Sequence, residues 1–156
     1  MKRRDCRGFT LLELMVVIVL VGVLLGMVSL ASGANPARQV RQDADAMVQV
    51  IDQLRQHAVF EGQEYGLRLS AEGYRVMRLG IRGWESVAAL SRWPQGVRPR
   101  LREQGYAISL GADEGPPQLL MLSNDETSAF TLTFESSNRI WLSLSGDGIG
   151  AVVIDG

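Results

Sequence analysis

The sequence predicts an α+β protein in which a long N-terminal helix, membrane-spanning in its first part, packs on a mostly antiparallel β domain. Three successive patterns predict this fold class. Residues 9–31 contain one charged side chain in 23 positions, residues 40–58 repeat apolar side chains at steps of three and four, and after Glu61 the apolar period falls to two. These patterns are typical of a membrane helix, an amphipathic helix and half-buried strands.

The apolar run from Phe9 to Ala31 has the length of a membrane helix. At about 1.5 Å per residue it spans a hydrocarbon core of about 30 Å. Residues 1–8 hold four basic side chains and one acidic, +4 − 1 = +3, so the positive-inside rule keeps this end in the cytoplasm. The one charge in the run, Glu13, would cost about 2.5 to 3.5 kcal/mol in lipid, and we therefore expect it to have a function.

The basic leader that ends in Gly8, followed by Phe9-Thr10-Leu11-Leu12-Glu13 and the apolar run, resembles the class III signal of type IV pilins and type II secretion pseudopilins. The resemblance implies that a prepilin peptidase cuts between Gly8 and Phe9 and methylates the new Phe9 amine. It also implies that Glu13 acts in filament assembly by pairing with the amine of an adjacent subunit. A glycine suits the cleavage position because, without a Cβ, it can lie extended in a narrow cleft.

An ordinary secretory signal peptide is the alternative, with a small-x-small cleavage site at Ser29-Leu30-Ala31. The apolar region of such a peptide is about 7 to 15 residues long. The longer run seen here, with Glu13 near its start, favours a helix that is retained.

The amphipathic part of the helix carries a single apolar stripe, which consists of Val40, Ala44, Met47, Ile51, Leu54 and Ala58. We expect the stripe to pack on the chain's own β domain, with a partner helix as the alternative. Gly26, Gly33 and Pro36 should loosen or kink the helix before this part. The predicted organisation is a cleaved leader (1–8), a transmembrane part (9–31), an amphipathic periplasmic part (32–60) and a periplasmic β-rich domain (61–156).

Strands are expected wherever apolar residues alternate between turn signals. The first two, at 65–69 and 74–78, should form a hairpin. Irregular structure is expected at 88–104, where Pro94, Gly96 and Pro99 break any long element. The remaining strands are expected at 84–87, 106–110, 119–122, 129–134, 139–144 and 151–154.

Residues 119–132 resemble the late hairpin of the H-class minor pseudopilins and their type IV pilus relatives, through an apolar strand followed by Ser123-x-x-Glu126-x-x-x-Phe130. Together with the N-terminal signal, this implies a pilin-like fold and a structural minor pseudopilin of a type II secretion system, at or near the tip of the periplasmic pseudopilus. The implied partners are other minor and major pseudopilins, the prepilin peptidase and the inner-membrane secretion platform. The implied location is the bacterial inner membrane, as a single-pass protein with a cytoplasmic N-terminus and a periplasmic C-terminal domain.

The alternative is a minor type IV pilus pilin that acts in pilus assembly or DNA uptake. Charge bears on this choice. Residues 75–102 hold seven Arg and one Glu, a net +6, whereas residues 103–156 hold eight acids and one Arg, a net −7. The Arg-rich segment, with Trp84 and Trp93 between its arginines, could contact nucleic acid or an acidic protein neighbour, or the two charges could neutralise each other in the fold. The acidic C-terminal third makes nucleic acid the weaker hypothesis.

Catalytic and metal-binding patterns are missing from the sequence. A Ser/His/Asp triad or a metal site would have to use the only histidine, His57, and the only cysteine, Cys6, lies in the leader. We therefore expect no enzyme, no cofactor and no metal. The loop at 145–150 could hold calcium through Asp147, but one carboxylate is too few for an oxygen cage, and a hairpin turn is the simpler interpretation.

Overall fold

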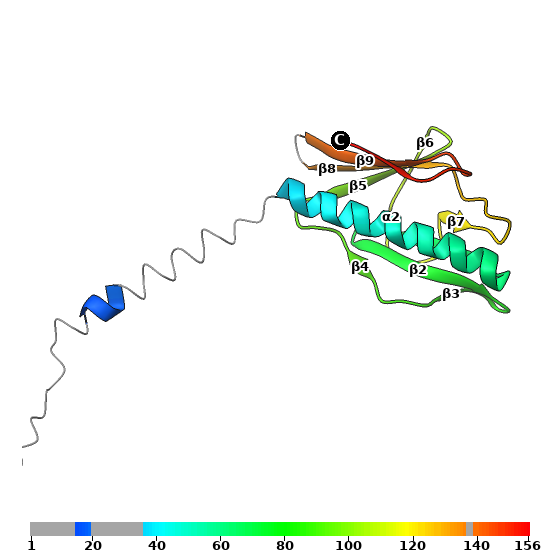
Figure 1. Cartoon of the computed structure of the whole chain (residues 1–156), viewed down its shortest axis with the longest axis horizontal. Coiled ribbons are helices and arrows are strands. Elements are labelled where there is room, and N and C mark those ends of the chain that lie inside the picture. The colour runs from blue at the N-terminus through cyan, green and yellow to red at the C-terminus, as the bar shows by residue number, and fades with distance from the viewer. Residues whose placement is uncertain (1–14, 20–35, 137–138) are drawn as a thin grey trace, which may run out of the picture. The chain divides into compact units, whose positions relative to one another are not determined.

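The computed structural model describes residues 15–19, 36–136 and 139–156. The chain divides into two units, residues 1–35 and residues 36–156. In the first unit, residues 15–19 are helical. The second unit consists of one long helix and two antiparallel sheets (Figure 1).

Helix α2 spans Pro36–Glu61. Proline suits the first turn of a helix because the N–H that it lacks has no partner there. The helix ends at Gly62, whose φ of 62° is left-handed, and the Gln63 N–H reaches back to the Ala58 carbonyl at 3.1 Å. This is the Schellman arrangement, for which glycine is the preferred residue.

The two sheets contain five strands each. The first has the order β3-β2-β1-β7, with β4 also paired to β2, and the second has the order β10-β9-β8-β5-β6. In the first sheet the strands are β1 (Tyr65–Leu69), β2 (Gly73–Gly80), β3 (Gly83–Ser86), β4 (Ser91–Arg92) and β7 (Leu119–Met121). In the second they are β5 (Arg98–Glu103), β6 (Tyr106–Ile108), β8 (Phe130–Ser136), β9 (Arg139–Gly146) and β10 (Val153–Asp155).

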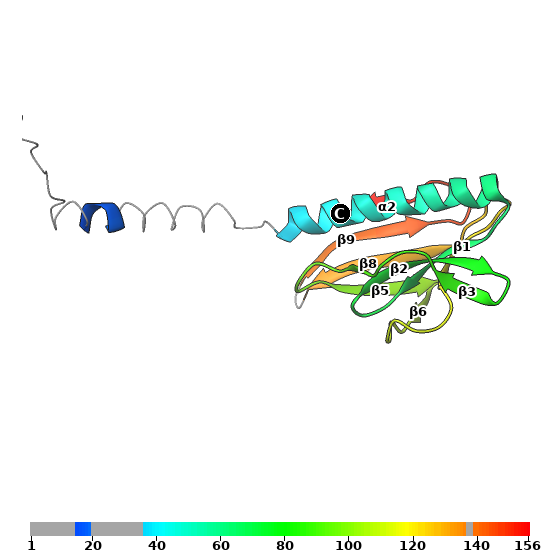
Figure 2. The ribbon, with the colours of Figure 1, turned by 90° about the horizontal axis from the view of Figure 1, so that it is seen from below.

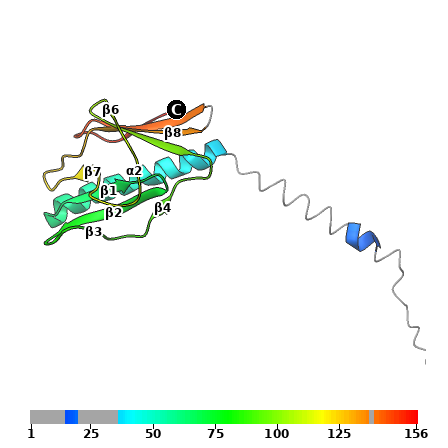
Figure 3. The ribbon, with the colours of Figure 1, turned by 180° about the vertical axis from the view of Figure 1, so that it is seen from behind.

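Helix α2 packs on both sheets, and its stripe forms the centre of the core. It contacts β1 and β7 of the first sheet and β9 of the second, and Figures 2 and 3 show it running along the two sheets. All six residues of the predicted stripe are at most 7% exposed. They join one apolar cluster with side chains from both sheets, among them Leu67, Leu132 and Phe134. Packing of the stripe on the chain's own domain is thereby confirmed.

The segment 88–104 is more regular than the sequence had suggested, although residues 88–90 and 93–97 do lie outside strands. It contains β4 and also β5, which lies between β8 and β6 inside the second sheet. Pro99 is tolerated because β6 pairs with β5 only from Leu101 to Glu103, so that Pro99 has a strand neighbour on one side alone. Trp93, in the same segment, is half-buried and packs between Tyr74 and Phe134, with ring centroids 5.4 and 5.5 Å away.

The two strands that flank the Ser123–Phe130 segment do not form a hairpin with each other. β7 pairs with β1, whereas β8 pairs with β5 and β9 in the other sheet. The connection closes on itself through a Leu122 N–H bond to the Glu126 carbonyl at 2.8 Å. The segment does fold back on β7, through an antiparallel bridge between Met121 and Thr127 and a Ser128 N–H bond to the Leu120 carbonyl at 3.0 Å. The predicted hairpin is therefore present as a short turn directly after β7, and the chain then changes sheet before β8.

Candidate functional site

The residues predicted for processing and assembly, Gly8, Phe9 and Glu13, lie outside the described residues. The nearest part that the structure describes is the helical segment 15–19, whose five apolar side chains are 45% to 63% exposed. Within the described part of the chain, no helix combines the length and apolar character needed to cross a membrane.

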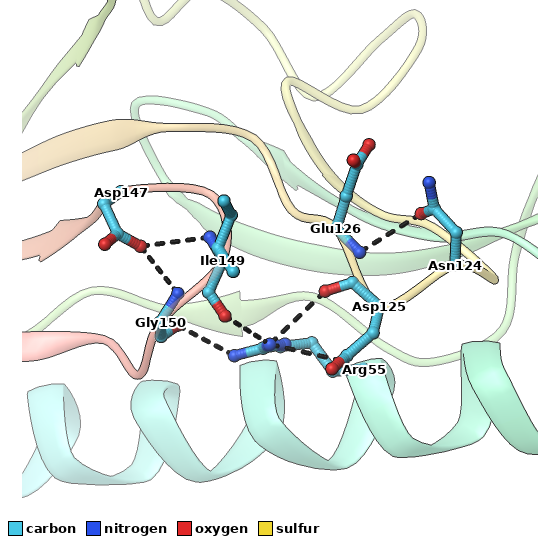
Figure 4. A network of polar contacts seen from close by, with 7 residues as sticks. All are labelled: Arg55, Asn124, Asp125, Glu126, Asp147, Ile149 and Gly150. Carbon is cyan, nitrogen blue, oxygen red and sulfur yellow. Dashed lines mark hydrogen bonds and ion pairs between the residues drawn. The ribbon is translucent and has the colours of Figure 1, made fainter.

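Among the described residues of this domain, the side chain of Arg55, on α2, forms the largest number of hydrogen bonds (Figure 4). Its Nη1 donates to the Gly150 carbonyl at 2.9 Å, and its Nη2 donates to the Ile149 carbonyl at 2.9 Å. Nη2 also lies 3.3 Å from the carbonyl O and 3.2 Å from Oδ1 of Asp125. One guanidinium, only 14% exposed, therefore ties the helix to two separate loops.

Each of these loops is shaped by an aspartate or asparagine side chain that accepts hydrogen bonds from nearby N–H groups. Asn124 Oδ1 accepts from the Glu126 N–H at 3.1 Å, and Asp147 Oδ1 accepts from the N–H groups of Ile149 and Gly150 at 3.0 and 2.7 Å. Such turns leave the carbonyl groups free to face the helix. Because one loop follows β7 and the other follows β9, Arg55 links α2 to both sheets.

Asp147 is occupied by its own turn. The N–H groups of Ile149 and then Gly150 hold the pKa of the Asp147 carboxyl below its usual range. The loop joins β9 to β10, which pair in antiparallel register from Val153↔Ser145. The hairpin interpretation of this loop is therefore confirmed. Among the described residues, no group of three or more His, Cys, Asp or Glu is arranged to hold a metal ion.

His57 lies on the exposed side of α2, where it forms a short polar chain with two neighbours. Its Nδ1 is 3.2 Å from Oε1 of Glu61, and the Tyr65 hydroxyl donates to the other oxygen of the same carboxylate. The hydrogen bonds from Tyr65 and then His57 lower the pKa of Glu61, and the bond to Glu61 raises the pKa of Tyr65. These hydrogen bonds favour the negatively charged form of Glu61 at the end of the helix.

The basic and acidic halves of the domain pair with each other in part. Arg75 forms an ion pair with Asp113, and Arg100 forms one with Glu135 on the neighbouring strand β8. Arg68, which lies before the basic segment, donates instead to the uncharged carbonyl groups of Pro116 and Ala112 at 3.0 and 2.9 Å. The two ion pairs therefore show that the opposite charges are partly neutralised within the fold, which was the simpler hypothesis for the uneven charge.

Arg55 was not singled out by the sequence, where it is one of several polar residues beside the apolar stripe. Its partners are backbone carbonyl groups 94 and 95 residues away, together with Asp125, 70 residues away. A carbonyl group is common to every residue type, so no sequence pattern marks such a partner.

Comparison with known proteins adds two findings. Residues 3–29 match the model of the prokaryotic N-terminal methylation motif. The chain also resembles solved structures: the minor pseudopilin EpsH from the type 2 secretion system of Vibrio cholerae matches with a TM-score of 0.65 and 19% identity, over 75% of this chain and 95% of EpsH. GspH of E. coli matches with a TM-score of 0.64 and 18% identity, over 79% of this chain and 93% of GspH.

The amphipathic helix on two antiparallel sheets, together with the methylation motif, defines a pilin-like fold. The particular family follows from sequence. The chain is 36% identical to type II secretion system protein H of Pseudomonas aeruginosa over 93% of both chains, and 26% identical to the protein H of Aeromonas hydrophila over 89% of this chain and 86% of that one. The chain belongs to the type II secretion system protein H family of minor pseudopilins. The alternative of a type IV pilus pilin is not favoured, because both of these relatives carry the name of the secretion system.

Proposed function

We propose that this chain assembles as a minor subunit at or near the tip of the periplasmic pseudopilus, which drives export of folded proteins across the outer membrane. The observation that carries the proposal is the methylation motif at residues 3–29 in a chain that is 36% identical to a type II secretion protein over 93% of its length. The family is structural, and the proposal assigns the chain no catalytic activity.

Processing in this proposal follows the order of the N-terminal residues. The prepilin peptidase removes residues 1–8 by cutting between Gly8 and Phe9 and methylates the Phe9 amine. Residues 9–31 stay in the inner membrane as a single span with the N-terminal end in the cytoplasm, as the +3 leader favours. The amphipathic part (32–60) and the β-rich domain (61–156) then lie in the periplasm.

We propose that Glu13 holds the subunit in its place in the filament by pairing with an adjacent subunit. After cleavage it follows the new amine by four residues, about one helical turn. In the low dielectric of the membrane its carboxylate is stabilised by pairing with the amine of an adjacent subunit, and both charges would be costly without a partner. The proposed partners are other minor and major pseudopilins, with the peptidase and the inner-membrane secretion platform acting during processing and assembly.

The test is N-terminal mass analysis of the membrane-purified chain, followed by secretion assays with Glu13→Ala. We expect a methylated Phe9 as the first residue, and we expect Glu13→Ala to insert into the membrane but not to support secretion. A first residue at Ser32 would instead indicate ordinary signal-peptide cleavage. Normal secretion with Glu13→Ala would contradict the role given to this carboxylate.

A further inference from the structure

Two apolar side chains at the C-terminal end of α2 are not covered by the domain. Phe60 is 90% exposed and Val59 is 49% exposed. Neither belongs to the apolar stripe, which ends at Ala58 and faces the core. The packing of the domain therefore does not explain them, and exposed apolar groups with a polar rim are typical of an interaction surface.

These side chains line a groove between the end of α2 and the turn that contains Asp125. We call it the α2-end groove, and its lining consists of Gln53, Gln56, His57, Val59, Phe60 and Asp125. Residues three and four apart share a face of a helix, so Gln53, Gln56 and Phe60 form one continuous edge. The groove thus combines apolar surface with amide groups and one carboxylate.

The side of the groove that is not helical is held in place by Arg55. Its Nη2 lies 3.2 Å from Oδ1 and 3.3 Å from the carbonyl O of Asp125. Because Arg55 belongs to the same helix as Phe60, the turn cannot easily move away from the helix. A groove that exists before its partner arrives lowers the entropy lost on binding.

The charge that the groove offers to a partner is negative. Asp125, the one carboxylate that lines the groove, remains 64% exposed in spite of its pair with Arg55. Glu61, which follows Phe60 in the chain but lies outside the groove lining, is 37% exposed. The Arg55 side chain, at 14% exposure, presents little of its positive charge to solvent. A complementary partner therefore carries lysine or arginine beside an apolar side chain.

We propose that the α2-end groove docks a neighbouring pseudopilin of a different type, through an apolar side chain flanked by lysine or arginine. The apolar side chain packs on Phe60 and Val59, and the cation lies against Asp125. A second copy of this chain fits less well, because an isologous contact would bring the exposed Asp125 carboxylates of two grooves together, and a head-to-tail contact would leave one groove open. This inference rests on the proposed function, since it assumes assembly with other pseudopilins.

The experiment uses the full-length chain in cells that contain the other pseudopilins of its own secretion system, each with a different tag. A photo-crosslinking amino acid replaces Gln56 in the groove or, as the matched control, Gln49, which is exposed two turns earlier on the same face of α2. We expect a cross-link to one tagged pseudopilin from position 56 and a much weaker one from position 49, because the activated side chain reacts only with atoms within its reach.

Two substitutions then test the apolar contact. Phe60→Ser should reduce the cross-link from position 56 about tenfold, which corresponds to about 1.4 kcal/mol. Ile81→Ser, at a fully exposed isoleucine outside the groove, should leave it unchanged. Both side chains are exposed, so neither change removes a core contact.

Equal cross-links from positions 49 and 56, a cross-link to a second copy alone, or no effect of Phe60→Ser would overturn the inference. Secretion is measured in the same cells to separate the two claims. If deletion of the chain abolishes secretion while position 56 gives no cross-link, the groove inference fails and the proposed function stands. If deletion leaves secretion intact, the proposed function fails and the groove inference falls with it.

Discussion

Arg55 shows how a single side chain can join elements that are distant in the sequence. It accounts for contacts between α2 and the loops after β7 and β9, and it does so through the carbonyl groups of Asp125, Ile149 and Gly150. Charged hydrogen bonds of this kind contribute more than neutral ones, and an arginine can form several at once because its donors are held in a rigid fork.

Replacing Arg55 should therefore destabilise the domain. We expect Arg55→Ala to lower the free energy of unfolding by about 2 to 3 kcal/mol, because three carbonyl groups and a carboxylate lose their donor. Arg41→Ala is the control, since Arg41 pairs with Asp45 at 3.7 Å on the exposed surface, where such pairs contribute about 0 to 1 kcal/mol. Denaturant unfolding measures both, and equal losses would contradict the role of Arg55.

Asp147 should give the domain a dependence on acid. Its pKa in the folded chain lies below the ordinary value of 3.8 because the N–H groups of Ile149 and Gly150 favour the carboxylate. The resulting stabilisation is present above the unfolded pKa and is lost as the pH falls through the folded pKa. The difference in unfolding free energy between wild type and Asp147→Ala should thus shrink as the pH is lowered below about 4.

The matched control is Asp147→Asn, which keeps an oxygen acceptor but has no charge to lose. Its own unfolding free energy should lack this contribution to the pH dependence. A difference between wild type and Asp147→Ala that is the same at pH 7 and in acid would show that the carboxylate does not act through its charge.

At the scale of elements, the sequence was informative where a pattern is local and repeated. The stripe from Val40 to Ala58 could be predicted because helix periodicity depends only on the residues of the helix itself. The strand β5 was missed because Pro99 is compatible with a strand only where one side lacks a partner, and pairing is decided by β6 and β8 elsewhere in the chain. The change of sheet between β7 and β8 depends on the same kind of distant partner.

The stripe should dominate the stability that α2 contributes. Ile51 is 1% exposed, and Ile51→Ala should reduce the free energy of unfolding by about 2 to 5 kcal/mol through lost burial and the cavity that it leaves. Val59→Ala, one of the two exposed positions in the α2-end groove, should change it by about 0.5 kcal/mol or less. Thermal or denaturant unfolding of the two variants compares them directly, and a large effect at Val59 would place that side chain in the core.

At the scale of the whole molecule, the chain divides after residue 35 into two units. The key residues of the first unit were predicted from a resemblance, whereas the structure describes the second unit almost completely. The fold class and the family could both be predicted from the sequence, because the N-terminal signal is local and specific. The α2-end groove could not be predicted in this way, because Phe60 is apolar like the residues of the stripe and differs from them only in the side of the helix on which it lies.

A fragment of residues 36–156 should fold as a soluble monomer. The core cluster, which includes the whole stripe, lies within this unit. The only cysteine of the chain, Cys6, lies in the leader and is absent from the fragment. We expect a near-UV circular dichroism signal and a cooperative unfolding transition without added oxidant or reductant. A compact species that lacks the near-UV signal would show that the stripe needs a partner to pack.

This fragment should bind protein in preference to DNA. The arginines of β5, Arg98, Arg100 and Arg102, are exposed, but Arg100 is paired with Glu135. Glu103, Glu135 and Asp155 lie on strands of the same sheet. Non-specific DNA binding depends on several simultaneous phosphate contacts and weakens steeply with salt. We therefore expect duplex DNA to bind with a dissociation constant of about 0.1 mM or weaker near physiological salt.

Titration of the fragment against DNA and against purified pseudopilins in one buffer tests this prediction. Tight, salt-sensitive DNA binding that is lost when the three arginines are changed to Glu, together with no pseudopilin binding, would favour the DNA-uptake alternative over the proposed function.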